Sequence, residues 1–472
     1  MHTVARATAL ALALPLAAGT LAAASPPAPP VPDFSGALSH PREDPYYPSK
    51  GDPRVDALHY ELELRWTPRT RTLTGTAAIT VRAARDVQRL QLDLGDSLRV
   101  RGVRLDGTPV PARHPGKYLV IDTGALAKGS RHTLRIAYSG TPKPVRAPVS
   151  RSDFSTVGWT TTRSGDVWTM QEPFGAFTWY PVNDHPSDKA YYDVTINTPR
   201  GEVGVFNGRM TSRRVVDGRT VTGWHLAAPA ASYLTTIAIG DYRRYRDTGP
   251  HGLPITYWVE RGDRDLLPEL RHTPALIRWL ERHLGRYPFD RIGAVVVPSR
   301  SAMETQTLIT MGANVRTQGA PWVEVLQHEY VHQWYGDSVT PDNWKDMWLN
   351  ESFAMYLEIR WSADKGYASM REWRRYLRLN DQYFRDVYGP PGEYDRDDFG
   401  SANVYYCGAL MLDRLHAKLG DRLFSQVLRR WPQRHAGDNV DRDDWIAWLN
   451  RVTDRNLRPF VTDWLTSPRT PR

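Results

Sequence analysis

The chain of 472 residues has only one cysteine, Cys407. One thiol cannot form a disulfide within the chain, so the stability of the fold must come from packing of its core. No motif that would activate a thiolate surrounds Cys407, which argues against a nucleophilic role. We therefore expect Cys407 to be a buried bystander.

Long apolar runs and blocks of like charge are also scarce. Only residues 7–24 form an extended apolar stretch, and no second run approaches the length that a membrane-spanning helix needs. The formal net charge is +9, but basic and acidic residues are interleaved along most of the chain, and the Arg-rich segment 371–376 is interpreted as one solvated helix face. These absences argue against stable membrane insertion and against a nucleic-acid partner. No sequence feature indicates an oligomeric state.

The N-terminus predicts export. Residues 1–6 supply a positive charge, an Ala/Leu-rich run follows, and the Ala-Ala-Ala at 22–24 offers a cleavage site. We expect residues 1–24 to be a signal peptide removed near Ala24, and the mature protein to be secreted. A retained anchor is the alternative, but the run is short and rich in small residues. Residues 25–45, proline-rich at their start, are expected to form a tether.

The period of the apolar residues lengthens near residue 250. Before it, apolar and polar residues alternate in short segments such as 58–66 and 134–138, which predicts an antiparallel β domain over residues 46–250. After it, the pattern predicts a mainly helical domain over residues 251–472. Helices are expected over residues 265–284, 321–335 and 350–361, the last with Asn350 as its N-cap. A short strand is expected over residues 294–297. The predicted fold class is therefore α+β, with two domains.

Residues 328–332 read His-Glu-Tyr-Val-His, an H-E-x-x-H motif. On a helix, His328 and His332 lie four residues apart and project from one face toward a single metal ion. Glu351 follows at the start of the next predicted helix. Two imidazoles and one carboxylate leave the fourth position of a zinc ion open for water, as in catalytic sites. Glu329 can contact that water without occupying a ligand position.

These motifs carry a resemblance to a known family. The H-E-x-x-H, the Trp-Leu-Asn-Glu at 348–351 and the Ser-Ala-Met-Glu-Thr at 301–305 resemble the aminopeptidase N family of zinc metallopeptidases. This is the gluzincin aminopeptidase family, which includes leukotriene-hydrolase-type enzymes. The resemblance covers residues 46–465 and implies a thermolysin-like catalytic domain. It further implies a short, secreted, bacterial-like form without the C-terminal helical domain of the larger members.

The resemblance also implies roles for the motif residues. His328, His332 and Glu351 would hold one zinc ion per chain, and Glu329 would be the general base. The segment at 301–305 corresponds to the family's Gly-x-Met-Glu-Asn signature, in which the Glu binds the α-amino group of the substrate. Glu304 takes that position. A carboxylate that faces an ammonium near zinc fixes cleavage one residue from the N-terminus.

Further substrate contacts follow from the same resemblance. Ala302 and Met303 lie beside Glu304 in the signature, whose flanking Gly and Asn are replaced here, so substrate positioning is the part most open to change. In the β domain, Glu172 matches a second amine-binding position and Gln171 is its neighbour.

An oxyanion-stabilising tyrosine is implied as well. The Val-Tyr-Tyr-Cys-Gly-Ala at 404–409 resembles the family's Val-Tyr-Glu-Lys-Gly-Ala, which places that tyrosine at Tyr405. The family's Glu-Lys pair is replaced by Tyr406 and Cys407, so Tyr406 is the alternative.

The implied function is a secreted zinc-dependent aminopeptidase that acts on peptides with a free N-terminus. The first alternative is a thermolysin-like zinc endopeptidase, which Glu304 argues against because an amine-binding carboxylate obstructs long substrates on that side. The second is a catalytically inert secreted binding protein, which the intact set of ligands and base disfavours.

Overall fold

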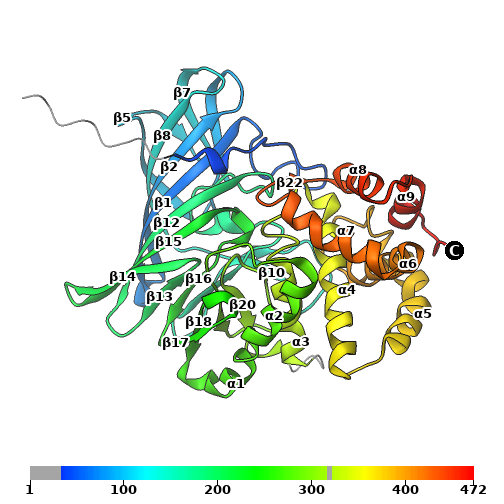
Figure 1. Cartoon of the computed structure of the whole chain (residues 1–472). Helices are drawn as coiled ribbons and strands as arrows, with labels where there is room; N and C mark the ends of the chain where they lie inside the picture. The colour runs from blue at the N-terminus through cyan, green and yellow to red at the C-terminus, as the bar shows by residue number, and fades with distance from the viewer. Residues whose placement is uncertain (1–32, 316–320) are drawn as a thin grey trace, which may run out of the picture. The chain divides into compact units, whose positions relative to one another are not determined.

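The computed structural model describes residues 33–315 and 321–472. From Phe34 to Arg472 the chain forms one compact unit, with strands in its first half and mostly helices in its second (Figure 1). The expected signal peptide and the first residues of the expected tether lie outside the described residues.

Within the range expected to form the tether, the described chain packs against the β domain from Phe34 onward. The Phe34 ring stacks on His59, with 4.9 Å between the ring centroids. Asp44 is buried, and its carboxylate accepts hydrogen bonds from the backbone N–H groups of Tyr47 at 2.8 Å and Trp344 at 2.7 Å. These contacts fasten the segment to both halves of the molecule.

The N-terminal domain is built on an eight-stranded sheet of order β14-β15-β12-β1-β2-β8-β4-β5. Its strands are β1 (Val55–Thr67), β2 (Thr72–Ala83), β4 (Leu98–Leu105), β5 (Thr108–Pro109), β8 (Arg131–Gly140), β12 (Lys189–Pro199), β14 (Arg209–Val216) and β15 (Arg219–Ala231). Alternate residues of β1 and β8 are buried, as the period of two predicts. The sheet is not wholly antiparallel, because β1 and β12 pair in parallel.

Two smaller sheets complete this domain. One has five strands: β13 (Val203–Phe206), β16 (Ile237–Gly240), β11 (Val167–Met170), β10 (Thr156–Thr161) and β9 (Val145–Arg146). The other has three: β3 (Val87–Asp93), β7 (Tyr118–Leu126) and β6 (Ala112–Arg113). The apolar core beneath them also includes Met303 and Trp344 of the second domain, so one core joins the two domains.

The second domain begins with a mixed sheet of β17 (Tyr242–Thr248), β18 (Pro254–Glu260), β19 (Ile292–Val297) and β20 (Ile309–Gly312). Strand β17 precedes the expected boundary at residue 250, yet it pairs with β18. The change of domain therefore falls near residue 241. A two-stranded sheet joins β21 (Thr340–Pro341) to β22 (Asn439–Val440).

Helices make up most of the second domain. They are α1 (Leu267–Leu270), α2 (Thr273–Leu284), α3 (Trp322–His332), α4 (Trp348–Lys365), α5 (Met370–Tyr388), α6 (Gly408–Leu419), α7 (Asp421–Arg434), α8 (Arg442–Thr453) and α9 (Arg458–Thr466). In the part of the chain that is described, none of them is long and apolar enough to span a bilayer. Cys407 is buried as expected, and burial raises its pKa well above the usual thiol value.

Three helix boundaries differ from the expected ones. The helix predicted over residues 265–284 is divided at Arg271 and His272 into α1 and α2, because Pro274, the second residue of α2, has no N–H to donate to the carbonyl of Leu270. Helix α3 ends at His332 rather than at residue 335. Asn350 is not an N-cap, because a 3₁₀ turn at Trp344–Asp346 leads directly into α4 and the N–H of Asn350 already bonds the carbonyl of Met347.

Candidate active site

Helices α3 and α4 pack together and bring the three predicted metal ligands into one cluster. The candidate ligand atoms of His328, His332 and Glu351 all lie within 4.8 Å of one another. Glu351 Oε2 is 3.2 Å from His328 Nε2 and 3.5 Å from His332 Nε2. All three side chains are buried. A carboxylate oxygen and two imidazole nitrogens that converge at this spacing suit one zinc ion.

The other ring nitrogen of each histidine already has a partner. His328 Nδ1 is 2.9 Å from Glu358 Oε2, and His332 Nδ1 is 3.1 Å from the carbonyl oxygen of Tyr335. Both partners are acceptors, so each Nδ1 carries the proton and each Nε2 presents its lone pair to the cluster. The early end of α3 makes the second bond possible, because the Tyr335 carbonyl turns back toward His332. This arrangement fits a bound zinc ion.

The electrostatics of the cluster favour a cation. Burial lowers the pKa of His328 and of His332, but the surrounding carboxylates outweigh burial and raise both above the usual imidazole value. Burial likewise raises the pKa of Glu351, yet the two imidazoles hold it well below the usual carboxyl range. The cluster thus attracts positive charge, which a divalent ion supplies.

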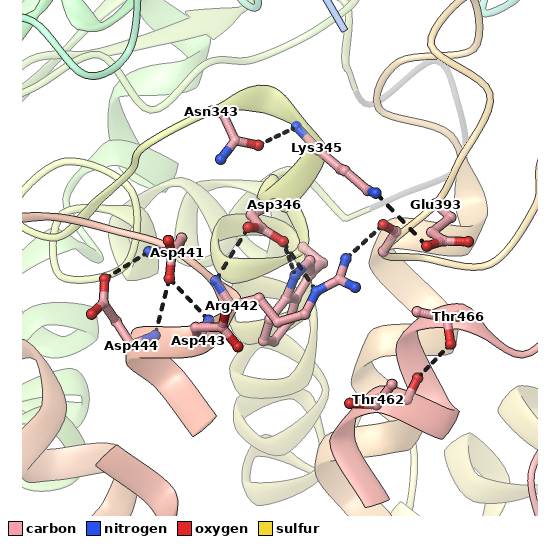
Figure 2. A network of polar contacts seen from close by, with 12 residues as sticks. Asn343, Lys345, Asp346, Glu393, Asp441, Arg442, Asp443, Asp444, Thr462 and Thr466 are labelled. Carbon is pink, nitrogen blue, oxygen red and sulfur yellow. Dashed lines mark hydrogen bonds and ion pairs between the residues drawn. The ribbon is translucent and has the colours of Figure 1, made fainter. Parts of the chain in front are cut away.

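The first turn of α4, which carries Glu351, is fixed by the polar network that Figure 2 shows. Asp346 precedes the helix and accepts hydrogen bonds from the indole N–H of Trp348 at 3.0 Å and the backbone N–H of Arg442 at 3.2 Å. Arg442 is the first residue of α8, which Asp441 caps. The start of α4 is therefore tied to α8, so Glu351 is held by a helix fixed at its end.

A cavity of about 440 Å³ opens over the cluster and contains further carboxylates. Glu329, Glu304 and Glu172 line it and are buried. Burial raises the pKa of all three, to about 8 for Glu329. Within residues 33–315 and 321–472, Glu304 Oε1 and Glu172 Oε1 have no hydrogen-bond partner. Buried carboxylate oxygens without partners are costly, and they mark a place where a cationic ligand would be stabilised.

The segment around Glu304 is held against the edge of the sheet. Met303 and Thr310 of β20 exchange two backbone hydrogen bonds of 2.9 Å. Gln333 Nε2 donates to the Glu304 carbonyl at 3.0 Å and also to Asp337 at 2.6 Å. The backbone of Glu304 is thus fixed independently of its carboxylate. Ala302 and Met303 line the cavity beside it.

Gln171 is the one predicted substrate contact that the structure does not bring to the cavity. Its amide nitrogen donates to the carbonyl oxygens of Ser232 at 2.8 Å and Thr235 at 2.7 Å, and its amide oxygen accepts from the indole of Trp179 at 3.0 Å. Gln171 does not line the cavity. The side-chain hydrogen bonds of Gln171 are made within the β domain, and its contact with substrate stays a prediction.

The tyrosine beside the cluster is Tyr405. It lies on a π-helical turn at Asn403–Cys407, and its ring stacks on that of His328 with 5.7 Å between centroids. Tyr406 also reaches the cavity wall, but its ring packs on Phe384 and Tyr376, with centroids 5.5 and 5.6 Å away. The geometry therefore favours Tyr405 over Tyr406.

Two residues of the site were missed from the sequence. Glu358 lies seven residues beyond Glu351, two helical turns along the same face of α4, so helical periodicity is a signal that points to it. Arg151 lines the cavity beside Tyr405 and comes from a loop of the β domain. No motif surrounds Arg151, so the sequence gives no signal for it.

Family models match both domains of the chain. The one described as Peptidase M1 N-terminal domain matches residues 56–234, and the one described as Peptidase family M1 domain matches residues 269–464. Together they account for most of the sequence.

The chain is also similar to curated proteins. Aminopeptidase M1 of Arabidopsis thaliana is 22% identical over 452 residues, which are 88% of this chain and 51% of that protein. Glutamyl aminopeptidase of Rattus norvegicus is 25% identical over 333 residues, 65% of this chain and 35% of that protein. The chain thus spans about half, or less, of the length of these relatives.

Solved structures agree with the family models. An M1 zinc metallopeptidase from Deinococcus radiodurans superposes with a TM-score of 0.79 at 25% identity, covering 91% of this chain and 98% of that one. Native yeast LTA4 hydrolase has the same fold, with a TM-score of 0.72 at 21% identity over 89% of this chain and 69% of that one. The resemblance drawn from the motifs is thereby confirmed, and the chain belongs to peptidase family M1, with a zinc-binding triad of His328, His332 and Glu351.

Proposed function

We propose that this protein is a secreted zinc-dependent aminopeptidase that hydrolyses N-terminal residues from peptides, with Glu329 as general base. The observation that carries the proposal is the presence of two further buried carboxylates, Glu304 and Glu172, in the same cavity as the zinc triad. Zinc hydrolysis alone needs only the triad and Glu329, so these two carboxylates need another purpose.

An N-terminal ammonium meets that need. Glu304 and Glu172 are desolvated, and the like charge of Glu304 adds to burial in raising the pKa of Glu172. A substrate ammonium between them would supply the missing positive charge and donate to the oxygens that lack protein partners. A peptide held by its ammonium next to zinc presents its first peptide bond to the metal. This arrangement favours an aminopeptidase over an endopeptidase.

The chemical step follows from the positions of the remaining residues. A zinc ion in the triad would act as a Lewis acid on the scissile carbonyl and lower the pKa of a water molecule. Glu329 follows His328 on α3 and lines the cavity, so its carboxylate can take a proton from the attacking water and return it to the leaving amine. Tyr405 can donate its hydroxyl proton to the oxyanion that develops on the carbonyl.

The similar proteins support this assignment. The curated relatives are aminopeptidases by name, and a mutant of the Deinococcus radiodurans metallopeptidase has been crystallised with a Tyr-Ser-Ala substrate. That enzyme is 25% identical to this chain and covers 91% of it. A tripeptide with a free N-terminus is the substrate class that the cavity carboxylates predict here.

The test uses the purified protein and a panel of aminoacyl-anilides, each also in N-acetylated form. Hydrolysis of the free forms, lost with a zinc chelator and restored by zinc, is expected. Glu329→Gln is expected to retain zinc by elemental analysis and to lose nearly all turnover. Equal rates on acetylated and free substrates would instead indicate an endopeptidase, and the absence of bound zinc would indicate a binding protein.

Export is proposed on the sequence of residues 1–24 alone. Expression of the full chain in a bacterial host should place the protein outside the cytoplasm, with a new N-terminus near Ser25 by terminal sequencing. Retention of residues 1–24 on the exported protein would favour the anchor.

A further inference from the structure

A loop of the β domain reaches the catalytic cavity and places one cation beside Tyr405. Three contacts tie the loop to the second domain. The carbonyl of Pro148 accepts from the backbone N–H of Phe399 at 2.8 Å, and the backbone N–H of Ser150 donates to Asp398 at 3.1 Å. Arg151 Nη1 donates to the carbonyl of Gly400 at 3.0 Å. The position of Arg151 is thus set by both domains.

The guanidinium of Arg151 is fixed in orientation. Asp153 holds its other edge in a two-point contact, with Nε at 3.3 Å and Nη2 at 2.7 Å from the two carboxylate oxygens. Such a planar fork leaves little rotational freedom. In this orientation Nη1 lies 3.5 Å from the hydroxyl oxygen of Tyr405. Hydrogen bonds at catalytic sites are often long before substrate binds and shorten in the complex.

A tyrosine hydroxyl has one proton to donate and lone pairs with which to accept. An N–H from Arg151 that occupies a lone pair prevents the hydroxyl proton from pointing toward Arg151. Among the described residues the Tyr405 hydroxyl donates no hydrogen bond, so its proton stays available to the cavity that Tyr405 lines. The cation also draws electron density from the phenol oxygen and strengthens the O–H as a donor.

We propose that Arg151 is a positioning residue for Tyr405: its N–H orients and polarises the phenol, so that the hydroxyl proton is aimed at the developing oxyanion. Arg151 itself does not touch the reacting atoms. The inference rests on the proposed aminopeptidase function and on the role of Tyr405 in it. It makes the oxyanion contact depend on the loop of the β domain, a dependence between domains that the triad does not have.

A double-mutant cycle tests the proposal. The variants are Arg151→Gln, Tyr405→Phe and their combination, assayed on the aminoacyl-anilide that the wild type cleaves fastest. Arg151→Gln is expected to lower kcat by about 10- to 100-fold, with KM changed less than about threefold, because an orienting contact acts on the transition state. In the Tyr405→Phe background, Arg151→Gln should lower kcat by less than about threefold, since no hydroxyl is left to orient.

Controls separate positioning from folding and from substrate binding. Zinc content and the melting temperature report whether the loop is still docked, and Arg151→Lys should recover part of kcat because it restores a charged donor without the fork. Arg300→Gln removes another arginine at the same cavity, and its effect should be the same with and without the Tyr405 hydroxyl. A dipeptide is compared with its C-amidated form to detect recognition of a substrate carboxylate.

The outcomes are distinct. Equal losses from Arg151→Gln in the wild-type and Tyr405→Phe backgrounds would overturn the proposal. A raised KM confined to peptides with a free C-terminal carboxylate would also overturn it and make Arg151 a substrate receptor. If the wild type lacks zinc-dependent aminopeptidase activity, the proposed function itself fails, which is a different result from additive losses in an active enzyme.

Discussion

Replacing Glu304 by Gln is the sharpest test of the ammonium-binding site. The substitution keeps the volume of the side chain and removes its charge. The carboxylate oxygen Oε1 has no hydrogen-bond partner within the described residues, and the backbone of Glu304 is held separately by Gln333. The variant should therefore fold and bind zinc normally, so any loss of activity reports on the substrate.

The size of the loss follows from the contact removed. A hydrogen bond to a charged group is worth about 1.5–3 kcal/mol, which corresponds to about 10- to 150-fold in kcat/KM. Glu172 remains in the cavity, so recognition of the ammonium is expected to be weakened rather than abolished. The assay compares kcat/KM for an aminoacyl-anilide with that for its N-acetylated form. Only the free form should lose this factor, because only it carries the ammonium.

Glu324→Gln is the matched control. Glu324 is another buried glutamate, on α3 but outside the cavity, and it accepts a hydrogen bond from Ser362 at 2.7 Å. The Glu324→Gln variant should have the same kcat/KM as the wild type. An ammonium-binding role for Glu304 is refuted if Glu304→Gln lowers kcat/KM for the acetylated substrate as much as for the free one, or if kcat/KM for the free substrate does not fall.

Three further predictions concern the metal site, the packing behind it and pH. Glu358→Ala should weaken zinc binding about 10- to 100-fold in a competition titration, because His328 loses its hydrogen-bond acceptor. Glu358→Gln keeps an acceptor and should bind zinc nearly as tightly as the wild type; an equal loss of zinc affinity in both variants would contradict this. Gly408→Ala should lower the free energy of unfolding by about 1–3 kcal/mol in chemical denaturation, since the new methyl overlaps the Ser352 side chain, and adding Ser352→Gly should restore part of that stability. An unchanged stability of Gly408→Ala would show that the helices can move apart. Burial, and to a lesser extent the charge of Asp166, raises the pKa of Glu260 from 4.5 to about 7. Between these two pH values the unfolded chain has released a proton that the folded protein still holds, so the free energy of unfolding falls as pH rises from about 4.5 to about 7. Glu260→Gln should therefore raise the melting temperature above pH 7 more than below pH 4.5, and an equal shift would count against this account.

The sequence was most informative for features that depend on the spacing of residues close together in the chain. The four-residue interval between His328 and His332 fixes their common direction on any helix, and alternation in the early strands fixes which side chains are buried. Both patterns appear in the structure as predicted. Helix ends were less well predicted, because the contacts that decide them come from distant segments. Asn350 looked like an N-cap, but the turn at Trp344–Asp346, held by Arg442 from α8, starts the helix earlier.

The substrate side of the site depends on tertiary structure in the same way. Gln171 and Glu172 are adjacent in sequence, yet only Glu172 lines the cavity, because the Gln171 side-chain amide is hydrogen-bonded to Ser232, Thr235 and Trp179. Arg151 reaches Tyr405 only because the loop that carries it docks on the second domain.

The sequence alone was enough to indicate the fold class and the three metal ligands. The fold class follows from the change in apolar period, and the ligands follow from the four-residue spacing on α3 and the motif around Glu351 on α4. Tertiary structure alone decided which neighbouring side chains face the metal, because convergence of segments hundreds of residues apart leaves no periodic trace in either segment.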